Sequence, residues 1–241
     1  MAGIKPNARR KPLKLIIFDC DGTLVDSQHM ILTAMTAAYG AHGIPLPKRE
    51  VLLSVIGLSL VEAFTKLGEG LEAFPAATMA EHYREAFHAM RAPGAPVEPL
   101  YPGAAAALAD LARREDVVLG IATGKSQRGV RLVLGHHGLL DHFITIKTAD
   151  DAPSKPDPGM VLAAMREAGA EAESTIVVGD TVYDIAMARA AGAAGVGVTW
   201  GYHPGAALER AGALAVVDRF ANLVPTLDSI WTKELPPSVR I

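Results

Sequence analysis

The stretch LKLIIFDCDGTLVDS, residues 13–27, joins an apolar run to a group of carboxylates. Its first half is a short apolar run of the kind that forms a buried strand. Its second half carries three carboxylates, Asp19, Asp21 and Asp26. Because neighbouring carboxylates repel one another, they need a cation, hydrogen bonds or protonation to coexist. The stretch therefore predicts a buried strand whose end faces a partner that allows these carboxylates to coexist.

Composition excludes several classes of protein. The 241 residues are half hydrophobic, which is enough for a full core and a smaller second unit. The net charge of -3 gives no basic field for nucleic acid, and no apolar run approaches the roughly 20 residues that span a bilayer. The single cysteine, Cys20, cannot form an internal disulfide. We expect a cytoplasmic protein whose partner is a small molecule, with no nucleic acid and no membrane; the oligomeric state stays open.

Short β-branched runs alternate with Ala-rich helical patterns along most of the chain. Each helical pattern is long enough for a helix, and several end at a glycine that can cap one. Buried strands in alternation with helices favour a parallel sheet covered on both faces. The expected fold is an α/β, doubly wound, Rossmann-like domain. Its strands are expected at residues 13–18, 117–123, 142–146, 174–180, 194–200 and 214–217.

One region interrupts this alternation with helical patterns alone. Residues 28–91 contain four such patterns, at 29–43, 48–58, 60–68 and 77–90, and a Pro- and Gly-rich linker follows. We therefore expect a helical cap, 28–91, inserted into an α/β core made of 13–27 and 92–241. Residues 1–12, basic and Pro-containing, are expected to form a flexible tail.

Polar side chains follow several of the predicted strands at the point where each strand ends. In an open parallel sheet, ligands bind beyond the carboxyl ends of the strands. Four segments that are far apart in sequence would therefore bring carboxylates, a hydroxyl and an ammonium to one edge. These residues are Asp19, Asp21, Thr123, Gly124, Lys125, Ser154, Lys155, Gly179, Asp180 and Asp184.

This set of side chains suits phosphoryl chemistry. Hard oxygen ligands such as Asp19, Asp21 and Asp180 suit Mg²⁺, which removes their mutual repulsion. A hydroxyl, backbone N–H groups and the compact charge of Lys155 suit phosphate oxygens. A carboxylate can attack phosphorus through an aspartyl-phosphate, and a second carboxylate two residues on can serve as acid and base.

The four motifs, in this order, resemble the haloacid dehalogenase superfamily. They are DCDGT at 19–23, Thr123 after an apolar strand, Lys155 in SKPDP and GDTVYD at 179–184, and the resemblance covers residues 13–228. It implies that Asp19 is the nucleophile and that Asp21 is the acid and base.

The same resemblance implies roles for the later motifs. Thr123 and Gly124 would bind the transferred phosphoryl group, and Lys155 would orient the nucleophile and the phosphate. Asp180 would hold Mg²⁺. Asp184 would contact the metal through a water molecule, or would contact the direct ligands instead of the metal. A helical insertion after the first motif is the arrangement of subfamily I.

The residues around the motifs narrow the reaction within this superfamily. Dehalogenases lack the second aspartate, which is present here as Asp21. Phosphonatases carry a cap lysine where Leu60 stands, and hexose phosphomutases differ at the positions of Thr23 and Ile31. The remaining interpretation is a phosphatase. The chain also resembles bacterial phosphoglycolate phosphatases in the stretches IATGKS, HHGL, TADDAPSKP and GVTWGYHP.

A phosphatase of this kind would hydrolyse 2-phosphoglycolate to glycolate and phosphate. The residues leave open another phosphoryl-transfer enzyme, a pyrophosphatase or a phosphosugar phosphatase. They also leave open a non-catalytic module that binds a metal or a phosphate. Within the expected cap, Gly57, Leu58 and Ser59 are candidates for contacting the part of the substrate that is not phosphate.

Overall fold

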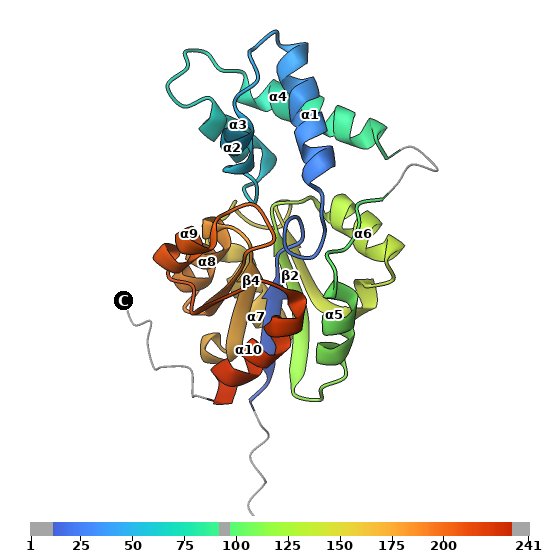
Figure 1. The fold of residues 1–241 in the computed structure, drawn as a ribbon, viewed down its shortest axis with the longest axis vertical. Coiled ribbons are helices and arrows are strands. Elements are labelled where there is room, and N and C mark those ends of the chain that lie inside the picture. The colour runs from blue at the N-terminus through green and yellow to red at the C-terminus, as the bar shows by residue number, and fades with distance from the viewer. Residues whose placement is uncertain (1–11, 92–96, 233–241) are drawn as a thin grey trace, which may run out of the picture.

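A six-stranded parallel sheet forms the centre of the protein, in the order β3-β2-β1-β4-β5-β6. The computed structural model describes residues 12–91 and 97–232, so the expected flexible tail lies almost wholly outside the described residues. The parallel sheet of the sequence prediction is confirmed (Figure 1). Its strands are β1 (Lys14–Phe18), β2 (Val117–Thr123), β3 (Phe143–Thr148), β4 (Thr175–Gly179), β5 (Ala194–Val198) and β6 (Ala215–Val217).

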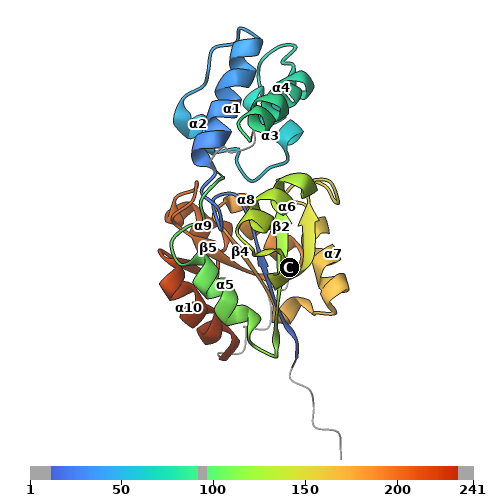
Figure 2. The same ribbon diagram turned by 90° about the vertical axis from the view of Figure 1, so that its right-hand side faces the viewer.

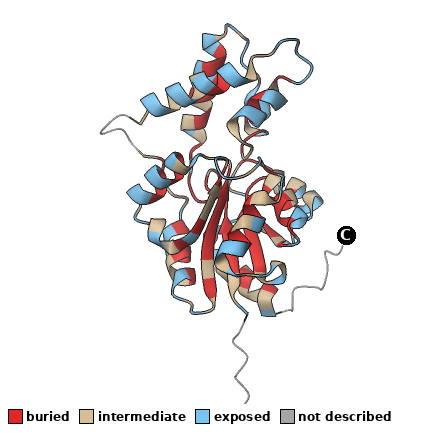
Figure 3. Ribbon diagram, turned by 180° about the vertical axis from the view of Figure 1, so that it is seen from behind, coloured by how far each residue is buried: buried red, intermediate tan, exposed pale blue. Residues whose placement is uncertain are grey.

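Strand β1 lies between β2 and β4, where the order of the strands reverses direction. Its side chains alternate between two apolar clusters, as the period of a strand requires. Ile16 and Phe18 pack in the cluster that includes residues of α5 (Ala104–Ala112), α6 (Gln127–His136) and α10 (Phe220–Thr232). Leu15 and Ile17 pack in the cluster that includes residues of α7 (Gly159–Ala168) and α8 (Val182–Ala190). Figure 3 shows the strands as the buried centre of the molecule, with helices that are exposed on their outer sides.

The helices of the core follow the strands in alternation. The sequence patterns do not predict α9 (Gly205–Ala211), α10 or the short 3-10 helices η1 (Leu140–His142) and η2 (Ala172–Ser174). Helix α10 contains Pro225, which lacks the N–H that a helix interior needs and so masks the helical pattern. The core helices are α5 (Ala104–Ala112), α6 (Gln127–His136), η1 (Leu140–His142), α7 (Gly159–Ala168), η2 (Ala172–Ser174), α8 (Val182–Ala190), α9 (Gly205–Ala211) and α10 (Phe220–Thr232).

Four helices between β1 and β2 stand above the carboxyl ends of the strands (Figures 1 and 2). They enclose their own apolar cluster, which includes Tyr39, Phe64 and Met79. The helix expected at 48–58 is shorter than predicted, because the chain turns at 54–57 and Gly57 adopts a φ of 100°. These helices are α1 (Gln28–Ala41), α2 (Arg49–Leu53), α3 (Leu60–Leu67) and α4 (Ala76–Ala89).

The two segments that lead into and out of this helical unit run side by side. Val25 forms an isolated antiparallel bridge with Leu100, and the N–H of Asp26 donates to the carbonyl oxygen of Pro99 at 2.8 Å. Both segments therefore connect to the core at one place, next to the end of β1. Within the described ranges, no helix has the length and apolar character needed to cross a membrane.

Candidate active site

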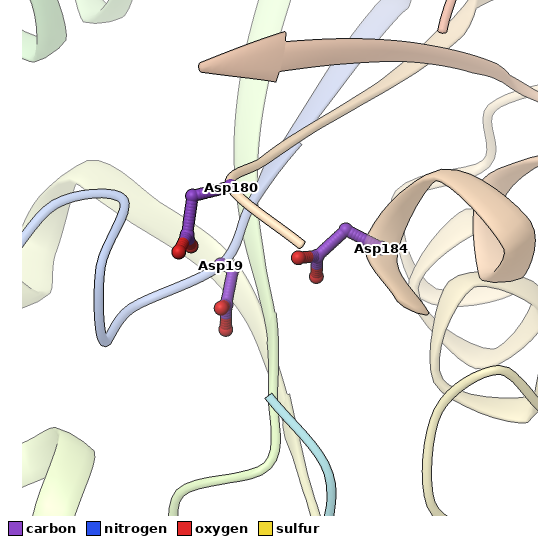
Figure 4. Close-up of side chains that lie close together, drawn as sticks. All are labelled: Asp19, Asp180 and Asp184. Carbon is purple, nitrogen blue, oxygen red and sulfur yellow. The ribbon is translucent and has the colours of Figure 1, made fainter. Parts of the chain in front are cut away.

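Three aspartates meet at the carboxyl edge of the sheet. Asp19 follows β1, Asp180 follows β4, and Asp184 lies in the first turn of α8. Each offers a carboxylate oxygen within 4.8 Å of the others, and all three residues are buried. Figure 4 shows these side chains converging from their separate segments. We call Asp19, Asp180 and Asp184 the acidic cluster.

Lys155 is the cation of this cluster. Its Nζ lies 2.9 Å from Oδ1 of Asp19 and 2.5 Å from Oδ1 of Asp184, and only 1% of the residue is exposed. Burial alone lowers the pKa of a lysine, but Asp184 and Asp19 outweigh it and raise the pKa of Lys155 above its ordinary value. Lys155 therefore stays charged and neutralises part of the acidic cluster.

Local hydrogen bonds fix the other members of the acidic cluster. Thr181 caps α8, and its N–H and hydroxyl donate to Oδ2 of Asp184 at 3.0 and 2.7 Å. Asp180 accepts from the hydroxyl of Thr23 at 2.9 Å and from the N–H of Tyr202 at 2.8 Å. These contacts hold the two carboxylates in place before any ligand binds.

The acidic cluster has the properties of a divalent-cation site. Three buried carboxylates face one buried ammonium, and Oδ2 of Asp19 has no hydrogen-bond partner among the described residues. Burial raises the pKa of Asp19 from 3.8 to about 6 although Lys155 opposes the change, and burial also raises the pKa of Asp180. A hard cation with oxygen ligands, such as Mg²⁺, fits this donor set.

Asp21 lies apart from the acidic cluster. Its two carboxylate oxygens accept from Nζ of Lys125 at 2.8 and 3.1 Å, and its Oδ1 also accepts from the hydroxyl of Ser27. Of the four residues proposed as metal ligands, the structure thus brings three together and turns the carboxylate of the fourth toward a lysine. Asp184, expected behind the direct ligands, lies in the cluster itself.

Thr123 and Gly124 lie at the end of β2, beside β1. Thr123 is buried, and its hydroxyl accepts from the N–H of Lys125 at 3.3 Å. Gly124 lies directly under the helical unit: a Cβ at this position would be 2.5 Å from the carbonyl oxygen of Leu58 and 2.7 Å from that of Gly57. A glycine is therefore required for this close approach.

A cavity of about 630 Å³ lies between the helical unit and the core. Asp19 and Asp21 lie at its core side, together with Thr123 and Gly124. The residues expected to contact the substrate, Gly57, Leu58 and Ser59, line the opposite side. The N–H of Ser59 also donates to the hydroxyl of Ser154 at 2.7 Å, so this segment is docked on the core next to Lys155.

Sequence reasoning missed Ser27 and Glu98, and it placed Lys125 at the edge of the sheet without assigning it a role. Lys125 and Ser27 hold Asp21, and Glu98 lies near Lys125. His137 is partly buried, with its Nε2 2.8 Å from the carbonyl oxygen of Glu98. Only Lys125 carries a local signal, because it follows Thr123 and Gly124 at the end of a predicted strand.

Comparisons with known proteins agree with this geometry. Residues 16–198 match the family model described as haloacid dehalogenase-like hydrolase. The chain is 36% identical to a probable phosphatase, IndB, of Dickeya dadantii, over 87% of this chain and 91% of that protein. It is 37% identical to a phosphoglycolate phosphatase of Rhodospirillum rubrum, over 87% of this chain and 89% of that protein. A crystal structure of a hydrolase from Pseudomonas syringae has a TM-score of 0.79 and 31% identity, with coverage of 90% and 99%.

Proposed function

The chain belongs to the haloacid dehalogenase-like hydrolases and is a phosphatase, and we propose that it hydrolyses a small phosphate monoester through a phosphorylated Asp19. One observation carries this proposal. Asp19 is a buried carboxylate that lines the cavity, forms an ion pair with Lys155 and has an oxygen without a hydrogen-bond partner. A buried carboxylate that is paired with a cation and has an oxygen without a hydrogen-bond partner is suited to act as a nucleophile.

The acidic cluster would hold Mg²⁺ through oxygens of Asp19, Asp180 and Asp184. When bound, the cation neutralises negative charge on the carboxylates and on the phosphoryl group. Thr123, at the end of β2, and Lys155, in the loop before α7, would lie beside the phosphoryl group.

The residues of the chain then perform two displacements at phosphorus. An oxygen of Asp19 forms a bond to phosphorus while the bond to the leaving oxygen breaks, and Asp21 gives that oxygen a proton. In the second displacement Asp21 takes a proton from water, whose oxygen bonds to phosphorus and releases Asp19 and inorganic phosphate. Acid and base catalysis of this kind is worth roughly 10²–10⁴-fold in rate.

The proposed substrate is 2-phosphoglycolate, which would yield glycolate and phosphate. Its support is the similarity to proteins that are named phosphoglycolate phosphatases. The proposed cap, residues 28–91, supplies Gly57, Leu58 and Ser59 to the cavity, and we propose that they contact the leaving group. We also propose that the protein acts in the cytoplasm on a free metabolite.

Phosphate release from a panel of esters tests this function. The panel contains 2-phosphoglycolate, sugar phosphates, pyrophosphate and an aryl phosphate, each with and without Mg²⁺, and each repeated with Asp19→Asn. Mg²⁺-dependent turnover that prefers 2-phosphoglycolate and is lost in the variant supports the whole proposal. Turnover of another ester, equally lost, keeps the mechanism and replaces the substrate. No turnover by the wild-type protein refutes the mechanism and leaves a binding module.

A further inference from the structure

Glu98 is a buried carboxylate that none of the motifs includes. It lies in the segment that returns from the helical unit to the core, and 3% of the residue is exposed. Its Oε1 accepts from Arg91, and its Oε2 has no hydrogen-bond partner among the described residues. A buried charge is costly unless cations compensate it, so its position needs an explanation.

The second cation near Glu98 is the lysine that holds Asp21. Nζ of Lys125 lies 3.6 Å from Oε1 of Glu98 and 2.8 Å from Oδ1 of Asp21. Only 8% of the Lys125 side chain is exposed. The ammonium is thus shared between a carboxylate of the proposed reaction and a carboxylate behind the cavity wall.

The far end of this arrangement belongs to the helical unit. Arg91 follows α4, and its guanidinium lies 4.8 Å from the ring centre of Phe87 in α4. Nζ of Lys125 lies 5.1 Å from the centre of the same ring. The four charges Asp21, Lys125, Glu98 and Arg91, which we call the charged array, therefore run from the core to the end of α4.

We propose that Glu98 is a positioning residue of the phosphatase reaction, which holds Lys125 beside Asp21 and ties that pair to Arg91 of the helical unit. The proposal rests on the function proposed above. Without the charge of Glu98, no carboxylate among the described residues lies between Arg91 and Lys125, and the contacts of the Lys125 ammonium that remain in this part of the chain are those with Asp21 and Phe87. Asp21 then loses the fixed orientation from which it protonates the leaving oxygen.

The dependence of the rate on the leaving group tests this role. An alkyl alcohol leaves only with a proton from Asp21, whereas an acidic phenol leaves almost without one. Glu98→Gln keeps the size of the side chain and removes its charge. We expect kcat/KM for an alkyl phosphate to fall by about tenfold or more, within the range of acid catalysis, and kcat/KM for p-nitrophenyl phosphate to fall much less.

The ratio of the two rates does not depend on how much of the variant is folded, because both esters are measured on one preparation. Asp228→Asn is the matched control, since it breaks the Arg114–Asp228 ion pair far from the cavity. This control should leave the ratio unchanged. An unchanged ratio in Glu98→Gln as well would overturn the proposal and make Glu98 a structural residue only.

A double variant tests whether Glu98 acts through Lys125. If it does, Glu98→Gln adds little to the effect of Lys125→Met on the ratio, because coupled residues are not additive. If the effects of Glu98→Gln and Lys125→Met on the ratio multiply in the double variant, Glu98 does not act through Lys125. Arg91→Met probes the same array from the helical unit, and we expect it to shift the ratio in the same direction as Glu98→Gln.

A measurement without turnover separates this proposal from the proposed function. The rate at which an acylating reagent modifies Lys125 is followed by mass spectrometry, with the exposed Lys48 as an internal standard. We expect Lys125 to react several-fold faster in Glu98→Gln than in the wild type, and equally slowly in Asp228→Asn. A wild type without activity would refute the function, and the labelling rate would still decide whether Glu98 holds Lys125. An unchanged labelling rate would overturn that link.

Discussion

Nζ of Lys155 lies 2.9 Å from Oδ1 of Asp19, and both residues are almost fully buried. The same ammonium contacts Asp184, so one positive charge serves two carboxylates, with Asp180 as the third. The acidic cluster with Lys155 therefore carries excess negative charge below the cavity. This excess explains the fit to a divalent cation, whereas the raised pKa of Asp19 is mainly a consequence of its burial.

Removal of Lys155 should destabilise the protein strongly. Lys155→Met leaves Asp19 and Asp184 buried without their cation, and breaking a buried pair in this way typically costs about 3–5 kcal/mol. Urea unfolding monitored by circular dichroism in EDTA measures the loss. The control is Lys147→Met, which breaks the more exposed pair with Glu167 and should cost less than about 1 kcal/mol. Equal losses in the two variants would contradict this account of Lys155.

The stability of the metal-free protein should depend on pH through Asp19. Burial raises its pKa from 3.8 in the unfolded chain to about 6 in the folded protein. The folded protein therefore binds this proton more tightly, so stability is highest below the lower value and falls as the pH rises to about 6. In EDTA, the free energy of unfolding of the wild type relative to Asp19→Asn should decrease across this window. A difference that does not vary with pH would show that Asp19 is not perturbed.

Mg²⁺ should stabilise the wild-type protein and act less on a variant that lacks one carboxylate. A ligand that binds only the folded state raises its stability. Thermal unfolding with increasing MgCl₂ should raise the Tm of the wild type more than that of Asp180→Asn, and a variant of the exposed Asp218 serves as the control. Equal shifts in all three proteins would place the cation elsewhere.

Gly124→Ala should disturb the docking of the helical unit. The new Cβ would meet the carbonyl oxygens of Leu58 and Gly57 at 2.5 and 2.7 Å, so residues 57–59 must move away from the core. Because small displacements in an active site cost much rate, we expect kcat/KM to fall by at least about tenfold. Gly40→Ala, at a helical position with open space around it, should leave kcat/KM unchanged. Wild-type kinetics in Gly124→Ala would show that this contact has no role.

Local patterns were sufficient to predict the fold and the place of the site. The apolar run before Asp19 and the one before Asp180 each form a strand, and neighbouring parallel strands bring their ends together. Thr123 lies at the same edge for the same reason. The position of these residues at strand ends therefore predicts that they lie at one edge of the sheet, without knowledge of any distance.

Contacts that depend on loops and on the helical unit were not predictable in this way. The pairing of Asp21 with Lys125 requires the path of the chain after β2, and the burial of Glu98 requires the docking of α4. The helix expected at 48–58 ends early because the chain turns to bring Gly57 against Thr181, which periodicity does not reveal. Such contacts arise from long-range packing rather than from the sequence near each residue.

Chemical trapping of the phosphorylated enzyme tests whether Asp19 is the nucleophile. The protein turns over an ester labelled with radioactive phosphorus, acid stops the reaction within milliseconds, and the labelled peptide is identified after proteolysis. We expect label on Asp19 and none in Asp19→Asn. Asp21→Asn should carry more label when the ester has a good leaving group, because hydrolysis of the intermediate is then slowed. Rapid turnover with no label on the protein, or label on another residue, would contradict the claim that Asp19 is the nucleophile.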